Sequence, residues 1–331
     1  MTATTTLPAS WFQSTPLYQL ERRAIFLKAW HFVGPFTRFV NRGEKVYYEI
    51  AQVKFYIVNT SPEGAGLGTN GIEVHRDNDD SSIRVHFTSG GLVFVTLSSE
   101  SLAFEGFFPD LEPLLSKVDF TKLKYRRSIS YEGGFNWKTM MDGYQECLHC
   151  QYTHPSFSKL YPPTSYSIQN HGSFCRHIAD PKKPDDGLFL YFFPICTLNV
   201  YGGGMSSFCT CPTPDPTVSR MEFDYYYNGE DEAFEEYFKF LRQVALEDYE
   251  LCVAAQQNLQ RGVYVEGVLN PEQESGVIYY QQVVRNLVLT KYKAEKVEAE
   301  EGAAKDGISC VSAGNQASPG LSASTTVGVG A

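Results

Sequence analysis

The segment between residues 231 and 261 most constrains the fold, because its apolar side chains recur at steps of three and four residues. This spacing places them on one face of a long α-helix, and Gly262 just after the last periodic residue is typical of a helix end. The apolar face comprises Phe234, Phe238, Leu241, Ala245, Cys252 and Leu259. We therefore predict a long amphipathic helix here.

Strand patterns precede this helix. A bent pair of strands is predicted over residues 45–58, and a hairpin over residues 83–98 around the Ser89-Gly90-Gly91 turn. Further strands are predicted at 124–131, 188–201 and 220–227, helices at 17–38, from Asn136 to about 150 and at 278–292, and a loop at 61–82. The fold class is α+β, with a small β unit followed by a larger antiparallel sheet.

Composition excludes several classes of protein. The chain has 331 residues with 28 Lys and Arg against 38 Asp and Glu, and no basic run that suits nucleic acid. Its longest apolar run, residues 91–97, is far shorter than the roughly 20 residues of a membrane-spanning helix. The first ten residues show no secretory signal, and the 8 cysteines are interpreted as thiols of a reducing compartment. We expect a cytoplasmic protein that binds neither nucleic acid nor membrane.

A carboxylate interrupts the apolar face of the long helix. Asp248 occupies a position that packing would give to Leu or Val. A buried carboxylate must meet a cation or a metal ion, or be neutralised. The alternative is a broken or supercoiled helix in which Asp248 reaches solvent beside Glu247 and Glu250.

A second polar stripe lies on the helix predicted after Asn136. Asp142, Glu146 and His149 follow at steps of four and three, so they share one face. His154 converges with His149 only if the helix bulges or ends between them. Two histidines and a remote carboxylate form the facial triad of mononuclear non-haem iron sites. The alternative is that both histidines are structural.

Other constellations compete with this interpretation. Cys147-x2-Cys150 and Cys209-x-Cys211 would supply four thiolates to a structural zinc ion, although the second spacing is tight. The glycines 202–204 lack the partners of a dinucleotide fingerprint and are predicted to bend the sheet. The abundant aromatic residues would suit a quaternary ammonium box, but core packing explains them better.

Several motifs resemble the catalytic-domain signature of Rieske non-haem iron oxygenase large (alpha) subunits, and their choline monooxygenase-like branch in particular. The signature motifs are Asn136-Trp137-Lys138, Asp142-Gly143-Tyr144, Glu146-Cys147, His149-Cys150 and His154-Pro155. Similar motifs elsewhere are Ser10-Trp11-Phe12, Leu20-Glu21-Arg22-Arg23, Ile25-Phe26, Trp30, Gly202-Gly203-Gly204-Met205, Glu247-Asp248, Gln256, Gly262-Val263-Tyr264, Pro271 and Glu274. The resemblance runs from about residue 7 to residue 292.

The resemblance implies a helix-grip (Bet v 1/START-like) catalytic domain preceded by a reduced small β domain. It implies that His149, His154 and Asp248 hold one Fe(2+) ion, and that Glu146 links this ion to a cluster on a neighbouring subunit of a trimer. Asp142 is a weaker candidate that would orient an imidazole. O2 and a small organic molecule would be the substrates of such a monooxygenase or dioxygenase.

The chain departs from the family at the [2Fe-2S] cluster, which needs one Cys-x-His and one Cys-x-x-His pair. No histidine has Cys three positions before it, and Cys147-x-His149 and Cys175-x-His177 lie in or after the iron motif. His75 is the single candidate ligand in residues 61–82 and is predicted to be a solvated loop residue. We therefore expect no [2Fe-2S] cluster. Either the loops were lost, or a gene model has omitted them.

Four segments follow from this interpretation: an N-terminal helical segment (1–40), a degenerate Rieske-like β domain (41–120), a mononuclear iron catalytic domain (121–293) and a disordered tail (294–331). The expected function is an iron-dependent hydroxylation or oxidative demethylation. Its electrons would come from the substrate, a diffusible reductant, ferredoxin or reductase, or a cluster-bearing homologue. Two alternatives are a redox-neutral metal-dependent hydrolase, lyase or isomerase, and a non-catalytic subunit that partners such a homologue.

Overall fold

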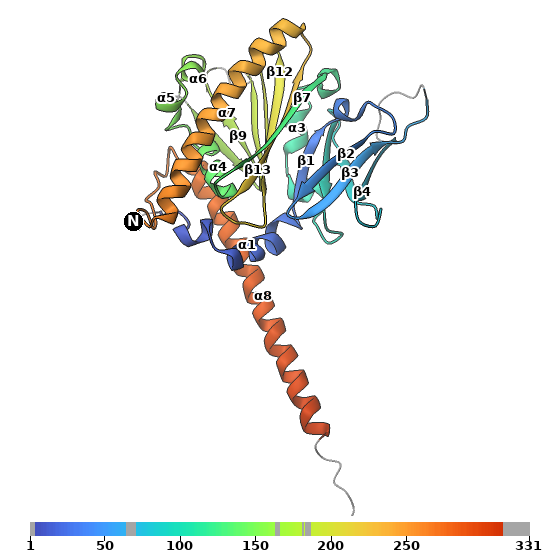
Figure 1. Cartoon of the computed structure of the whole chain (residues 1–331), viewed down its shortest axis with the longest axis vertical. Helices are drawn as coiled ribbons and strands as arrows, with labels where there is room; N and C mark the ends of the chain where they lie inside the picture. Colours follow the sequence, from blue (N-terminus) through green and yellow to red (C-terminus); the bar gives the residue numbers. More distant parts are fainter. Residues whose placement is uncertain (1–3, 64–70, 163–165, 181, 183–186, 314–331) are drawn as a thin grey trace, which may run out of the picture. The chain divides into compact units, whose positions relative to one another are not determined.

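A computed structural model describes residues 4–63, 71–162, 166–180, 182 and 187–313 (Figure 1). The chain divides into a first unit, residues 1–288, and a second unit, residues 289–331. The sheets and the predicted site all lie in the first unit, and each unit is described by itself.

A seven-stranded antiparallel sheet forms the centre of the first unit, in the order β7-β13-β12-β11-β10-β9-β8. Its strands are β7 (Tyr125–Gly133), β8 (Ser167–His171), β9 (Phe174–Ile178), β10 (Leu188–Phe192), β11 (Cys196–Tyr201), β12 (Gly204–Pro212) and β13 (Ser219–Tyr227). The sequence predicted the strand before Asn136 and the one at 220–227, and it merged β10 and β11 into a single apolar run. The Gly202-Gly203 turn between β11 and β12, with φ of +60° and +82°, is the predicted bend in the sheet.

Two three-stranded sheets precede the large one, in the orders β1-β6-β5 and β2-β3-β4. Their strands are β1 (Trp30–Pro35), β2 (Lys45–Ile50), β3 (Val53–Asn59), β4 (Ile72–Arg76), β5 (Arg84–Phe87) and β6 (Leu92–Thr96). The bend between β2 and β3 is a two-residue turn in which Ala51 and Gln52 have positive φ, as a tight hairpin requires.

Two predictions for this region are wrong. The helix expected over 17–38 ends early: α1 (Thr15–Glu21) continues as a π-helical turn, Arg22–Phe26, and β1 then begins at Trp30. All six residues of β1 are buried, and they pair with β6, so tertiary pairing overrides the helical spacing. The loop expected over 61–82 contains β4, because Ile72 and Val74 alternate with more exposed residues and pack into the core; residues 64–70 lie outside the described residues.

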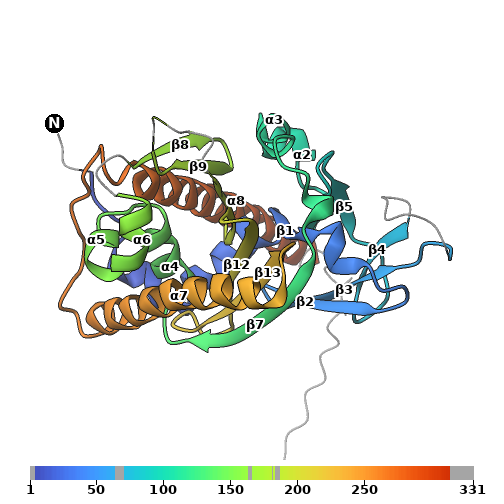
Figure 2. The same cartoon turned by 90° about the horizontal axis from the view of Figure 1, so that it is seen from above.

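Helix α7 (Asp231–Gln260) crosses the large sheet, and α4 (Trp137–Tyr144) packs beside it (Figures 1 and 2). The ring of Phe238 on α7 meets that of Tyr225 on β13 edge-on, at a centroid distance of 5.0 Å. The remaining helices are α2 (Phe104–Phe107), α3 (Leu111–Leu115), α5 (Cys150–Thr153), α6 (Pro155–Leu160), α8 (Ser275–Ala313) and the short 3-10 turns Ala9–Phe12, Phe36–Phe39 and Phe120–Lys122. The long helix predicted from its apolar face is therefore confirmed, and it lies on the sheet.

Two buried polar contacts join the N-terminal segment to α4 and α7. Glu21 accepts a 2.7 Å bond from Lys138 Nζ and a 2.9 Å bond from the Trp137 indole, and both charged side chains are fully buried. Gln256 on α7 accepts from the backbone N–H of Asn136 at 3.0 Å and donates to the Phe12 carbonyl at 3.2 Å. These contacts fix the start of α4 against α7.

Helix α8 continues to Ala313, whereas a disordered tail was predicted from residue 294. Residues 293–301 are rich in Ala, Glu and Lys, which favour helix, and Lys291–Glu295 and Lys296–Glu300 form ion pairs one turn apart. Residues 314–331 lie outside the described residues. Within the described part of the chain, none of the helices is both long and apolar enough to cross a bilayer.

Replacing Lys138 by Met should lower the free energy of unfolding by about 3–5 kcal/mol, because it leaves the Glu21 carboxylate buried without a counter-charge. The double variant Glu21→Gln/Lys138→Met should recover most of this loss, since Gln still accepts from Trp137. Urea denaturation measures both, with the exposed Lys122→Met as the control. Equal stability of the Lys138→Met variant and the parent would show that Glu21 does not need the charge of Lys138 in the folded protein.

Two buried histidines should make the fold acid-sensitive. Burial lowers the pKa of His31 to about 4, partly opposed by its bond to the Phe26 carbonyl, and burial lowers the pKa of His177 to about 3. Because the unfolded chain takes up protons near pH 6.5 and the folded chain does not, stability falls as the pH drops. Each should cost about 2 kcal/mol between pH 6.5 and pH 5.

Urea denaturation at the two pH values measures this loss. His31→Gln, which keeps the donor to Phe26, should lose about 2 kcal/mol less than the parent on acidification. In the control His75→Gln the loss should not shrink, because the Asp80 carbonyl and Glu73 raise the pKa of His75. An unchanged acid loss in His31→Gln would refute the assignment.

Candidate metal centre

The chain between α4 and α6 places two imidazoles side by side. Helix α4 begins at its N-cap Asn136, as predicted, but ends at Tyr144 rather than near residue 150. His149 directly precedes the short helix α5, and His154 separates α5 from α6, whose first residue is Pro155. The predicted helix is thus broken before His149, and the short helix α5 ends at Thr153, between the two histidines, which meets the condition for their convergence.

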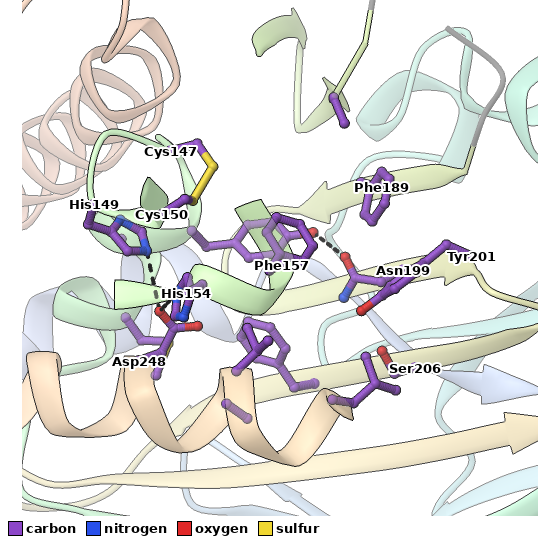
Figure 3. Close-up of a pocket in the computed structure, with 18 of the residues that line it drawn as sticks. Cys147, His149, Cys150, His154, Phe157, Phe189, Asn199, Tyr201, Ser206 and Asp248 are labelled. Atoms are coloured by element: carbon purple, nitrogen blue, oxygen red, sulfur yellow. Dashed lines mark hydrogen bonds and ion pairs between the residues drawn. A yellow bond between two sulfur atoms is a disulfide. The ribbon is translucent and has the colours of Figure 1, made fainter. Parts of the chain in front are cut away.

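The three side chains proposed as ligands come together (Figure 3). Their ligand atoms in His149, His154 and Asp248 lie within 4.8 Å of one another. Asp248 Oδ1 is 3.4 Å from His149 Nε2 and 2.9 Å from His154 Nε2, and the imidazole planes are inclined at 80°. Two imidazole nitrogens and one carboxylate on one side of a common point suit a divalent transition metal with open positions.

The outer nitrogens of both rings are also held. Glu146 binds His149 Nδ1, and Glu247 Oε2 lies 2.8 Å from His154 Nδ1. Such carboxylates fix the tautomer and orientation of metal-binding imidazoles. The family resemblance predicted Glu146 near the iron, whereas Glu247 was given no role of its own and was named only in the Glu247-Asp248 motif and in the alternative in which Asp248 reaches solvent. Its position directly before Asp248 was the signal available.

The electrostatics of the cluster favour a bound cation. Burial disfavours charged imidazole, but the hydrogen bonds that Asp248 and Glu146 accept from His149 outweigh it and raise the pKa of His149 to about 10. Asp248 likewise outweighs burial to raise the pKa of His154. Burial opposes ionisation of Asp248, but the hydrogen bonds and positive charge of the two imidazoles outweigh burial and lower the pKa of Asp248. Positive charge is therefore stabilised here, and a metal ion would supply it in place of the protons.

Asp142 does not orient an imidazole, so that prediction is wrong. Because α4 ends at Tyr144, the face that Asp142 shares with His149 on a continuous helix is broken. The carboxylate of Asp142 instead accepts hydrogen bonds from Tyr280 and, at 2.6 Å, from Gln281 on α8. Burial raises the pKa of Asp142 to about 7, against the effect of these bonds.

The interpretation of all cysteines as thiols is also wrong. Cys147 and Cys150 form a disulfide, because the turn before α5 brings their Cα atoms to 5.1 Å. Both border the same cavity as the imidazoles (Figure 3). Cys209 and Cys211 lie apart on β12 as free thiols. Among the described residues, His149, His154 and Asp248 are the one group that could hold a metal, so the four-thiolate zinc alternative has no support.

A cavity of about 130 Å³ lies between these residues and the large sheet. Eight aromatic residues form one part of its wall: Tyr144, Phe157, Tyr166, Phe189, Tyr201, Phe208, Phe223 and Tyr225. Two polar side chains, Asn199 and Ser206, lie opposite the imidazoles in Figure 3. A small organic molecule would lie beside the metal ligands here. Asn199 and Ser206 were not found from the sequence, because only strand pairing reveals which face they share.

Comparison with known protein families identifies the family to which this chain belongs. The family of ring hydroxylating alpha subunits (catalytic domain) matches residues 120–186 and 173–290, more than half of the chain. The fold and the convergent His, His and Asp side chains agree with this match, and the resemblance in the sequence is confirmed. The chain belongs to the ring hydroxylating alpha subunit family.

Individual relatives match with low identity. The glycine betaine monooxygenase oxygenase subunit of Pseudomonas aeruginosa is 29% identical over 104 residues, which are 29% of this chain and 24% of that protein. The carnitine monooxygenase oxygenase subunit of Acinetobacter pittii is 24% identical over 221 residues, 59% of each chain. This chain therefore matches less than two thirds of the length of either relative.

Solved structures share the fold. The quaternary ammonium Rieske monooxygenase CntA in complex with L-carnitine has a TM-score of 0.71 and 19% identity, covering 86% of this chain and 96% of that one. A naphthalene 1,2-dioxygenase from Rhodococcus sp. bound to indole has a TM-score of 0.64 and 13% identity, covering 86% and 94%. The predicted α+β class, an antiparallel sheet with long helices after small β sheets, is confirmed.

Replacing Glu247 by Gln should weaken metal binding about 10–100-fold, because the orienting carboxylate of His154 is lost while the ligand atoms remain. Competition with a chelating dye under anaerobic conditions measures the affinity for Fe(II) or Zn(II). The matched control is Glu250→Gln, an exposed carboxylate on the same helix. An affinity of Glu247→Gln equal to that of the control would show that Glu247 does not hold the site.

Proposed function

We propose that this chain is a mononuclear non-haem iron-dependent oxidoreductase that hydroxylates or oxidatively demethylates a small organic molecule. The carrying observation is the convergence of His149, His154 and Asp248 at the edge of an aromatic cavity. The family match supports it, because the matching family is named for ring hydroxylation. The relatives support a monooxygenase reaction on a small organic molecule, since their names are glycine betaine monooxygenase and carnitine monooxygenase.

The donor set fits a ferrous ion. His149 Nε2, His154 Nε2 and a carboxylate oxygen of Asp248 would hold it, leaving the cavity side for O2 and substrate. Bound iron would supply O2 activation. Glu146 and Glu247 would keep each Nε2 free of its proton by accepting from the opposite nitrogen. The aromatic wall would exclude water and hold the substrate against the site.

The electron supply is the part of the proposal that sets this chain apart from its family. Because the sequence lacks the Cys-x-x-His pair of a Rieske cluster, we propose that electrons come from the substrate, a diffusible reductant or reductase, or a cluster-bearing homologue in a mixed trimer. Glu146 would link His149 to the cluster of that homologue, since its carboxylate binds His149 Nδ1 and its side chain is partly exposed. In this proposal residues 41–120 are the degenerate Rieske-like domain and residues 121–293 the catalytic domain.

Anaerobic purification with iron and acid-labile sulfide analysis tests the proposal. We expect about one iron per chain and no sulfide, and loss of the iron in Asp248→Ala, with Asp231→Ala at the exposed start of the same helix as the control. If Asp248→Ala retains as much iron as the parent, Asp248 is not a ligand and the proposed triad is wrong.

Oxygen uptake then separates the candidate functions. Uptake with a chemical reductant supports an oxygenase, and uptake that requires an added cluster-bearing homologue supports the mixed trimer. A protein that holds iron but never consumes O2 with either would point instead to the redox-neutral alternative.

A further inference from the structure

Four residues at paired positions on neighbouring strands lie side by side on the floor of the cavity. Phe189 on β10 pairs with Asn199 on β11, Asn199 pairs with Ser206 on β12, and Ser206 pairs with Tyr225 on β13. Cross-strand partners point to the same face of a sheet. All four border the cavity, so two adjacent polar side chains lie between two aromatic rings on its floor.

The polar pair presents hydrogen-bond donors. Tyr144 donates to Asn199 Oδ1 at 2.7 Å, and burial raises the pKa of Tyr144, which keeps its hydroxyl protonated. With Oδ1 occupied, the Asn199 amide has its Nδ2 to offer, whose contact with Thr197 Oγ1 is a long 3.5 Å. The hydroxyl of Ser206 has no protein partner in the part of the chain that the structure describes, and its residue is 7% exposed.

The charged residues around the cavity indicate which kind of hydrogen-bond acceptor on a substrate would bind there. Its described lining residues include the carboxylates of Glu146 and Asp248 but no Lys or Arg. Arg242 on α7 stacks over the rings of Tyr131 and Phe223 and is not a lining residue. At Asn199 and Ser206, across the cavity from the imidazoles and the proposed metal ion, a substrate carboxylate would lose its hydration without meeting a Lys or Arg side chain in the lining. A neutral carbonyl oxygen would meet two donors at no such cost.

We propose that Asn199 and Ser206 form a specificity site for the neutral carbonyl oxygen of the substrate, whose apolar part lies along the aromatic wall toward the metal. In Figure 3 the pair lies across the cavity from His149, His154 and Asp248, so the group to be oxidised would lie at the opposite end of the molecule from the carbonyl. This inference rests on the proposed function and narrows its substrate class to uncharged carbonyl compounds, excluding carboxylates.

Ligand binding to the full chain freed of metal by a chelator, so that no open metal position binds the probes directly, tests the proposal independently of turnover. The probes are acetophenone, ethylbenzene, benzoate and L-carnitine, followed by calorimetry. We expect acetophenone to bind about ten-fold more tightly than ethylbenzene, as two neutral hydrogen bonds would give, and no saturable binding of the two carboxylates. Asn199→Leu should abolish the preference for acetophenone, and Ser206→Ala should reduce it about three-fold.

Matched controls separate binding from folding. Ser207→Ala changes the adjacent residue of β12, which points to the opposite face, and should leave the preference unchanged. Asn199→Asp keeps the side-chain shape but removes the donor, so it should lose the preference even if Asn199→Leu unfolds. Equal binding of acetophenone and ethylbenzene, no saturable acetophenone binding, tight benzoate binding, or a preference that survives in Asn199→Asp would overturn the proposal. If the chain prefers acetophenone but never takes up O2, the proposed oxygenase function is refuted, whereas the carbonyl site stands.

Discussion

A carboxylate on the sheet-facing side of α7 sets the constraint on which the site depends. Asp248 replaces an apolar residue on that side, and the surrounding structure supplies two imidazoles within 3.4 Å of its Oδ1. The chain between α4 and α6 must break its helix to deliver them. Glu146 and Glu247 then hold the outer nitrogens, so a layer of charge encloses the position where a cation is stabilised.

The sequence was sufficient where one residue pattern had one structural solution. The long helix α7 and the hairpin of β5 and β6 followed from periodicity and a Gly-Gly turn. The three proposed ligands followed from an apolar stripe that contained one carboxylate, together with the family motif. Elements whose apolar pattern suits both helix and strand were misassigned, as at Trp30–Pro35, because only pairing with β6 decides between the two.

Features that depend on contacts between distant segments were out of reach of the sequence. The role of Glu247 depends on the end of α5, where His154 turns toward α7. Asp142 does not orient an imidazole as predicted, because α4 ends at Tyr144 and the side chains of Tyr280 and Gln281 on α8 donate to its carboxylate. The pairing of Asn199 with Ser206 needs the exact strand register, since a shift of one residue would turn both away from the cavity.

The amide of Gln256 gives the N-terminal segment a mechanical role in the site. Gln256 lies eight residues after Asp248 on the same helix, about 12 Å along the axis. Its side chain donates a hydrogen bond to the Phe12 carbonyl and accepts one from the backbone N–H of Asn136 at the start of α4. Because Gln256 and Asp248 share one helix, the contact with Phe12 also anchors the segment that carries the carboxylate.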